Sequence, residues 1–247
     1  MEIKNQRGLG ISSIEEWLLY APPAKGDRHW VDGRSAKELA KAWFYSGEPR
    51  MPVELRQLLD SHEDTIGFIA DKAIPEYETK LDSFKGSGRI HDLIVTGEGS
   101  GKSMLISIEA KVDESFGEII SKYLLKSVSN NTKTKIPERT EQLGLSIFGN
   151  KSIGHIRYQL LHAIAGTLIE AEKMNAAQAV FVIHEFVPFG KQSKKSKQNN
   201  EDLKIFVNLL TDMPHNIGQL IGPLKVIGGG NVSSNIPLYI GKIESKI

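Results

Sequence analysis

Two carboxylates and a lysine near the middle of the chain are residue types that can carry out metal-dependent chemistry. Asp92, Glu109 and Lys111 are spaced so that neighbouring β-strands can bring them to one patch of a sheet. Two carboxylates this close repel each other unless a cation lies between them. Carboxylate oxygens are the ligands that magnesium prefers, so these residues predict a divalent-metal site.

A β-hairpin must position these side chains. Residues 103–112 alternate strictly between apolar and polar positions, which is typical of a strand and places Glu109 and the lysine on one face. Residues 90–96 are rich in β-branched side chains and predict the partner strand. A glycine-rich turn at residues 100–101 then sets Asp92 opposite Glu109. The alternative is a solvated strand face on which the glutamate and the lysine form an ordinary ion pair.

The same residues resemble a known signature. Asp92 followed by residues 109–111, Glu-Ala-Lys, is similar to the D-x(n)-(D/E)-x-K pattern of the PD-(D/E)XK nuclease superfamily, although the proline that opens that pattern is absent. Over most of residues 30–243 the chain resembles an uncharacterised bacterial family placed in that superfamily, whose substrate is not settled. The segments that carry this likeness are residues 35–40, 74–76, 109–117 and 156–162.

This resemblance implies an α/β fold with a restriction-endonuclease-like core, in which a mixed β-sheet with a central antiparallel hairpin is flanked by helices. In such a site Mg²⁺, or Mn²⁺ in its place, would be held by Asp92, Glu109 and the Ala110 carbonyl. The expected function is therefore Mg²⁺-dependent phosphodiester hydrolysis of nucleic acid, with DNA favoured as the substrate, in defence or repair.

Further residues are assigned roles by the same resemblance. Lys111 would orient or deprotonate the attacking water and offset charge in the transition state. Gln159 would lie on the helix after the catalytic strand and face the metal or the nucleic-acid backbone, the alternative being a solvent-facing first turn. An additional acidic residue from the supporting elements is expected to be Glu63 or Glu76, and the sequence does not choose between them.

Charge supports a second hypothesis. The net charge of +1 lacks the electrostatic footprint of a protein whose whole surface grips nucleic acid. This favours a catalytically silent nuclease-fold protein that serves as a binding module or a partner subunit, and a homodimer is also open. The intact set of two acids and a lysine favours the enzyme.

Composition limits the class of protein. The 247 residues contain no cysteine, which excludes disulfide scaffolds, thiolate zinc sites and cysteine nucleophiles. No apolar run approaches the length of a membrane span, and the first residues lack the apolar core of a signal peptide, so we expect a cytoplasmic protein without membrane contact. A single domain over residues 1–247 is expected, with a mostly helical N-terminal support at 1–72 and a nuclease-like α/β core at 73–247.

A near match to the phosphate-binding loop occurs within the hairpin. Residues 96–103, TGEGSGKS, follow the pattern G-x-x-x-x-G-K-[ST] except that Thr96 replaces the first glycine. A phosphate loop needs a helix that begins at the lysine, whereas the residues from Ser103 onward alternate as a strand does. We therefore interpret this stretch as a turn.

The remaining elements follow from periodicity and from helix start signals. Helices are expected at residues 14–20, 35–46, 52–59, 61–70, 119–128, 139–148, 153–174 and 201–212. Besides the hairpin, strands are expected at residues 76–84, 179–186, 224–227 and 237–243, the last of them at the sheet edge. The order predicts an α/β protein with three antiparallel strands followed by a long helix and a strand buried on both faces.

Histidines and a lysine-rich stretch are assigned no chemistry. His155 and His162 lie on one helical stripe but too far apart for an i, i+4 zinc pair, so polar packing is expected for both. His184 lies in the buried strand and is expected to be a core histidine with satisfied hydrogen bonds. Residues 191–200 are polar and lysine-rich, which predicts a mobile surface loop, and contact with phosphates is the alternative.

Overall fold

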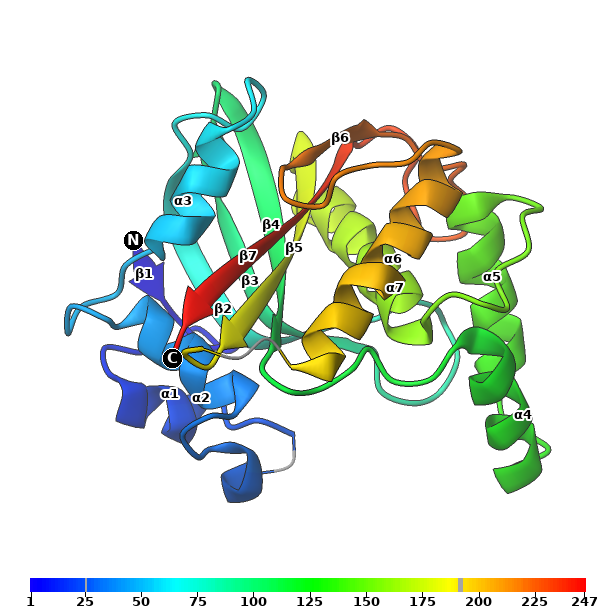
Figure 1. Ribbon diagram of the computed structural model, residues 1–247, viewed down its shortest axis with the longest axis horizontal. Helices are drawn as coiled ribbons and strands as arrows, with labels where there is room; N and C mark the ends of the chain where they lie inside the picture. The colour runs from blue at the N-terminus through cyan, green and yellow to red at the C-terminus, as the bar shows by residue number, and fades with distance from the viewer. Residues whose placement is uncertain (25, 191–192) are drawn as a thin grey trace.

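The structure, a computed structural model, describes residues 1–24, 26–190 and 193–247. A mixed seven-stranded sheet in the order β1-β2-β3-β4-β5-β7-β6 lies between two groups of helices, with α1 to α3 on one side and α5 to α7 on the other (Figure 1). This confirms the predicted α/β class, mixed sheet and flanking helices. Within the described parts of the chain, no helix is long and apolar enough to cross a membrane.

The elements have the following bounds. The strands are β1 (Glu2–Ile3), β2 (Ile69–Thr79), β3 (Arg89–Gly99), β4 (Lys102–Lys111), β5 (Gln178–Val187), β6 (Ile221–Leu224) and β7 (Leu238–Lys246). The helices are α1 (Ile14–Tyr20), the 3₁₀ helix η1 (Gly26–His29), α2 (Ser35–Trp43), α3 (Val53–Asp60), α4 (Ile120–Asn130), α5 (Ile136–Phe148), α6 (Tyr158–Lys173) and α7 (Lys194–Thr211).

The central hairpin has the predicted register. Strands β3 and β4 are antiparallel, with Leu93 opposite Ile108. Ser100 and Gly101 form the turn and have φ values of 49° and 70°, which a two-residue hairpin loop of type I′ requires. Because β4 begins at Lys102 and no helix follows that lysine, this stretch cannot cradle a phosphate as a phosphate loop does.

Each face of the sheet has its own apolar core. Ile106 and Ile108 of β4 pack with α2 and α3, whereas Leu105 of the same strand packs with α5, α6 and α7. This alternation is the one that the sequence predicts, and both faces of β4 are buried. The ten residues of β5 are all buried, as expected for a strand covered on both sides.

Three sequence-based elements were wrong around the sheet. The helix expected at residues 61–70 does not form, because Gly67 adopts φ 70° in a turn and β2 begins two residues later at Ile69. Strand β2 therefore ends at Thr79, and most of the strand expected at residues 76–84 is loop. Strand β7 lies between β5 and β6, so β6 forms the sheet edge. The expected division between residues 72 and 73 falls within β2.

The polar stretch before α7 is more ordered than the sequence suggests. Residues 194–200 belong to α7, so the predicted mobile loop is wrong there, while residues 191–192 lie outside the described part of the chain. The Ser193 hydroxyl caps the helix by accepting the Ser196 N–H at 3.0 Å. Buried Ser196 donates to Glu185 at 3.0 Å, and Asn199 donates to the Glu114 carbonyl at 2.9 Å. These tertiary hydrogen bonds anchor the first two turns of α7, which carry little apolar surface.

Candidate active site

The candidate site lies where β3 and β4 stop pairing. Their ladder ends at Leu93 and Ile108, and Asp92 and Glu109 come directly after that pair on the two adjacent strands. Beyond the ladder, the Asp92 carboxylate accepts the backbone N–H of Ala110 at 2.7 Å. A side chain thus takes over the hydrogen bond that the neighbouring strand would otherwise make, and it brings a carboxylate between the strands.

Side chains of β3 change faces at the same point. Leu93 packs with α2 and α3, but His91 contacts the Ser107 hydroxyl at 2.6 Å on the side of α6. Two residues of the same parity therefore point to opposite faces, which a regular strand does not allow. On β2, Glu76 has φ 49°, an uncommon backbone conformation for a non-glycine residue. Irregularities of this kind concentrate next to functional sites.

Glu109 is the hub of the site and is 2% exposed. One of its carboxylate oxygens accepts hydrogen bonds from Lys111 Nζ at 2.7 Å and from Gln159 Nε2 at 2.6 Å. The other oxygen is paired with the Arg89 guanidinium. Lys111 also donates to the Gln159 side-chain carbonyl at 3.2 Å. Strands β3 and β4 and helix α6 thus meet at one carboxylate.

The carboxylates of the site have shifted pKa values. Burial, followed by the charge of Glu109, raises the pKa of Asp92. Burial, followed by the charge of Asp92, raises the pKa of Glu76 to about 8. Burial alone would also raise the pKa of Glu109, but the charges of Arg89 and Lys111 outweigh it and lower that pKa. Such opposed shifts among neighbouring acids are a feature of functional sites.

Of the two upstream glutamates, the structure places Glu76 beside the site. The register of β2 and β3 brings Glu76 level with Asp92, because Pro75 pairs with Leu93 and Tyr77 pairs with His91. The carbonyl of Glu63, by contrast, accepts the hydroxyl of a hairpin-turn serine at 2.5 Å, at the other end of the hairpin. Glu76, Asp92 and Glu109 therefore follow one another across three adjacent strands.

Sequence reasoning missed Arg89. Strict alternation along β3 puts Arg89 on the same face as Leu93, away from Glu109, whereas the change of face at Asp92 brings it to the site. A signal for this change is present in the sequence. Arg89 and His91 are polar while Ile90 is apolar, which is the reverse of the order that Leu93 and the residues after it follow.

Helix α6 covers the site with one stripe of its surface. Gln159 contacts Glu109, and the Cα of Gly166 lies so close to β3 that a Cβ there would be 3.0 Å from His91 Nε2. Burial lowers the pKa of His162 to about 3, so this histidine is neutral. His155 is exposed and precedes the helix. His162 therefore fits the expected packing role, whereas the expectation was wrong for His155, which does not pack and is not on the helix.

The side chains of the site include the carboxylates that magnesium prefers, but other groups of the protein already occupy Glu109. Asp92 and Glu109 supply carboxylate oxygens on adjacent strands, as a hard divalent cation requires. Both oxygens of Glu109 are already occupied, one of them by the Arg89 guanidinium. In the part of the chain that the structure describes, no three acidic, histidine or cysteine side chains are placed to hold a metal. A cation would have to displace Arg89 from one oxygen of Glu109, or Lys111 and Gln159 from the other.

Comparison with known proteins places the chain in a family without an assigned activity. No curated protein matches the chain, and no solved structure matches it. Residues 10–247 match the family described as "Domain of unknown function (DUF6946)". The match begins before α1, ends at the last residue of the sequence and includes every residue of the candidate site. Because the match spans well over half of its length, the chain belongs to the DUF6946 family.

Proposed function

We propose that this protein is a divalent-metal-dependent nuclease that hydrolyses phosphodiester bonds in nucleic acid, with DNA as the favoured substrate. One observation carries the proposal: Lys111 and Gln159 converge on Glu109 at the point where its strand parts from that of Asp92. Two acids, a lysine and a glutamine from three separate elements meet there, which a solvated strand face would not require. The lysine is 5% exposed, so a surface ion pair does not describe it.

The order of elements supports a restriction-endonuclease-like core within the α/β fold. Strands β2, β3 and β4 are antiparallel neighbours, and α4, α5 and α6 then connect β4 to the parallel strand β5. The candidate residues lie toward the end of β4 and at the start of α6. In this proposal the hairpin supplies the acids, and the helix supplies the glutamine that orients them.

The chemistry assigned to each residue follows from its contacts. When bound, Mg²⁺ would polarise a phosphate oxygen and lower the pKa of a water, and Asp92, Glu109 and the Ala110 carbonyl would hold it. The Lys111 ammonium is fixed by Glu109 and Gln159, so it can donate to an oxygen on which negative charge develops. Gln159 holds the lysine and the glutamate in one geometry through its two polar atoms.

Substitution of Lys111 tests the proposal. Lys111→Met should lower the turnover number by about 10² to 10³, the range found for preorganised electrostatic groups, and leave substrate affinity nearly unchanged. Cleavage of single- and double-stranded DNA and RNA should be measured with Mg²⁺ and with Mn²⁺, and a melting curve should show that the variant is folded. Lys102→Met removes an exposed lysine at the hairpin turn and serves as the control. A wild-type protein that cleaves none of these substrates would refute the nuclease.

The Arg89–Glu109 pair supports a second candidate, a catalytically silent nuclease-fold protein that acts as a binding module or partner subunit. In that case Arg89 permanently fills the position of the cation and balances the charge of Glu109. Lys111→Met would then cost stability without affecting any reaction. Nucleic-acid binding that persists at the same affinity in EDTA, together with no cleavage, would favour this candidate.

A further inference from the structure

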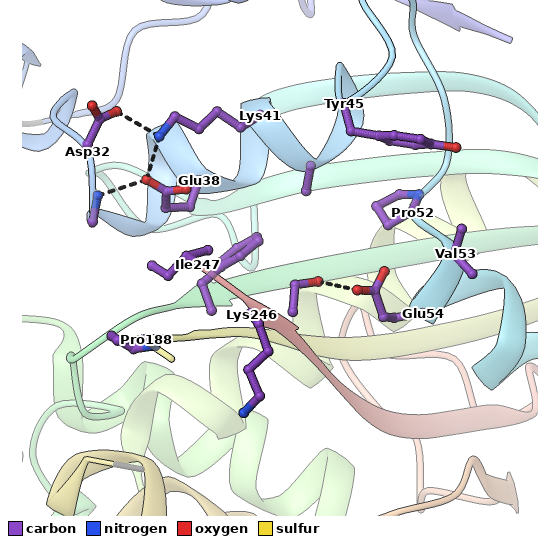
Figure 2. Close-up of a pocket in the computed structure, with 14 residues that line it drawn as sticks. Asp32, Glu38, Lys41, Tyr45, Pro52, Val53, Glu54, Pro188, Lys246 and Ile247 are labelled. Carbon is purple, nitrogen blue, oxygen red and sulfur yellow. Dashed lines mark hydrogen bonds and ion pairs between the residues drawn. The ribbon is translucent and has the colours of Figure 1, made fainter. Parts of the chain in front are cut away.

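A cleft lies on the other side of the sheet from the carboxylates. It has a volume of about 760 Å³ and is formed by α2, the segment that leads into α3, and the C-terminal ends of β5 and β7 (Figure 2). Its volume falls within the range of small-molecule sites, and the ends of parallel strands are a common position for such sites. The residues proposed for nuclease chemistry do not line it.

The wall of the cleft is largely apolar. Tyr45 and Val53 are more than half exposed, although both are large apolar or aromatic side chains. Buried Phe186 lies on the sheet side, and Pro52 lies near the Tyr45 ring (Figure 2). These surfaces can cover the hydrocarbon part of a ligand, and the face of a tyrosine ring also attracts cations.

The charges around the cleft are unevenly satisfied. At one end of the cleft, Asp32 pairs with Lys37 at 3.0 Å and with Lys41 at 2.7 Å, and Lys41 also pairs with Glu38 at 3.0 Å, so the two acids there have two cationic partners. Glu54, at the other end, has no ion-pair partner among the residues that the structure describes. Figure 2 shows the Lys246 side chain directed away from Glu54. The cleft therefore contains one carboxylate for which the described residues supply no countercharge.

A chain of hydrogen bonds fixes that carboxylate. The Ser245 hydroxyl donates to Glu54 Oε1 at 2.9 Å, because a carboxylate can only accept. The Ser245 oxygen must then accept from His184 Nε2, which lies 2.8 Å away. Burial lowers the pKa of His184 to about 3, so its ring is neutral, and the contact with Ser245 requires the proton to lie on Nε2. Ser245 thus fixes one oxygen of Glu54, and the second oxygen is left on the side of Pro52 and Tyr45 (Figure 2).

We propose that this cleft binds a small organic cation, a primary amine on an apolar or aromatic body. The ammonium would donate to the second oxygen of Glu54 and lie against the Tyr45 ring. The apolar body would cover Val53, Pro52 and Phe186, away from the ion pairs that Asp32 and Glu38 make with lysines. An anionic ligand would meet Glu54 without compensation, and a neutral one would leave its charge unpaired. This site does not depend on the proposed nuclease.

Calorimetric titration with phenethylamine tests the site. The wild-type protein should bind the amine in a saturable way, at least ten-fold more tightly than phenethyl alcohol, and should not bind 3-phenylpropionate. Glu54→Gln keeps an acceptor for Ser245 but removes the charge, so it should weaken amine binding at least ten-fold. Tyr45→Ala should weaken it about three- to ten-fold through loss of the ring.

The control is Glu48→Gln. Glu48 is an exposed glutamate in the segment between α2 and α3, and it does not line the cleft. It should bind phenethylamine as the wild type does, and all three variants should melt close to the wild type. No saturable binding by the wild type would overturn the proposal. Equal affinity for the amine and the alcohol would overturn it too, as would equal losses in the Glu54 and Glu48 variants.

Discussion

At the level of single residues, Arg89 and Lys111 supply the positive charge that lets Glu109 stay ionised while it is buried. Their charges lower the pKa of Glu109 although burial opposes this, and Asp92 beside it shows the reverse shift. Unpaired buried charges are costly, so a carboxylate in this position needs a cation of some kind. The chain provides an arginine, and the proposed function replaces it with a metal.

Substitution of Arg89 should show whether the arginine and a metal compete for Glu109. Arg89→Met should lower the stability of the metal-free protein by about 2–4 kcal/mol, because one partner of a buried ion pair is lost. It should also tighten Mn²⁺ binding about ten-fold, because the guanidinium no longer occupies Glu109. Calorimetry with Mn²⁺ and melting curves with and without EDTA measure both effects. Arg34→Met, which removes an exposed arginine, should change neither. Unchanged Mn²⁺ affinity in the Arg89 variant would mean that Arg89 does not compete with a metal for Glu109.

The raised pKa of Glu76 predicts a pH dependence of stability. Burial and the charge of Asp92 raise this pKa from 4.5 to about 8. The folded protein therefore keeps a proton that the unfolded chain releases near pH 4.5, and stability falls as the pH rises from there through about 8. In EDTA, Glu76→Gln should gain about 1–3 kcal/mol over the wild type at pH 9 and almost nothing at pH 4. Urea unfolding at both pH values measures the difference.

The control for this experiment is Glu98→Gln, which removes an exposed glutamate of β3. Its stability relative to the wild type should not change between the two pH values by more than about 0.5 kcal/mol. A Glu76 variant that behaves in the same way would show that Glu76 is ionised in the folded protein at neutral pH.

At the level of elements, the local sequence pattern was sufficient to predict the regular central hairpin. The hairpin register follows from the type I′ turn at Ser100 and Gly101 and from the alternation of β4. The sequence therefore predicted that Asp92 and Glu109 are neighbours. Pattern failed where tertiary contacts decide. The polar start of α7 forms because Ser196 and Asn199 find buried partners, which no local window contains.

The candidate site shows the same limit more sharply. Alternation placed Glu109 and Lys111 on one face because β4 is regular, but the same alternation, extended along β3, would put Arg89 on the face away from Glu109, because β3 changes faces at Asp92. Glu76 has positive φ on the neighbouring strand, a conformation that nothing in the residue type announces. Asp92 and Glu109 were therefore predictable from regular alternation, whereas the arginine that pairs with Glu109 could be found only from the reversed polar and apolar order at residues 89–91.

Helix α6 approaches β3 closely at Gly166, and this predicts the effect of Gly166→Ala on stability. In an ordinary helix interior, replacement of glycine by alanine stabilises by about 1 kcal/mol. Here the new Cβ would lie 3.0 Å from His91 Nε2 and 3.1 Å from Arg89 Cγ, so these two side chains, which are held by Ser107 and Glu109, must move by a few tenths of an ångström. Gly166→Ala should therefore destabilise by about 1–2 kcal/mol in urea unfolding. Gly10→Ala, whose Cβ would meet no atom within 4 Å, is the control. Stabilisation by Gly166→Ala would show that the contact is loose.

At the level of the whole molecule, the N-terminal helices and the sheet share one core. Trp17, Leu39 and Trp43 pack in the same cluster as Leu93 and Ile108 of the hairpin. Strand β1 also pairs with β2, which crosses the expected boundary at residues 72 and 73. Removal of the N-terminal helices would expose one whole face of the sheet, so the two segments should not fold independently.

Unfolding of the full chain tests whether the N-terminal helices and the sheet unfold together. The three tryptophans, Trp17, Trp30 and Trp43, all lie before residue 73, so their fluorescence reports the N-terminal helices. Far-UV circular dichroism is dominated by the longer elements after that residue. The two signals should give coincident urea transitions, because burial of Trp43 at 0% exposure depends on the sheet. Trp30→Phe, which removes the tryptophan that is only partly buried, should leave this coincidence unchanged. Fluorescence that changes at a lower urea concentration than the dichroism would instead divide the chain into an N-terminal helical domain and a separate α/β domain.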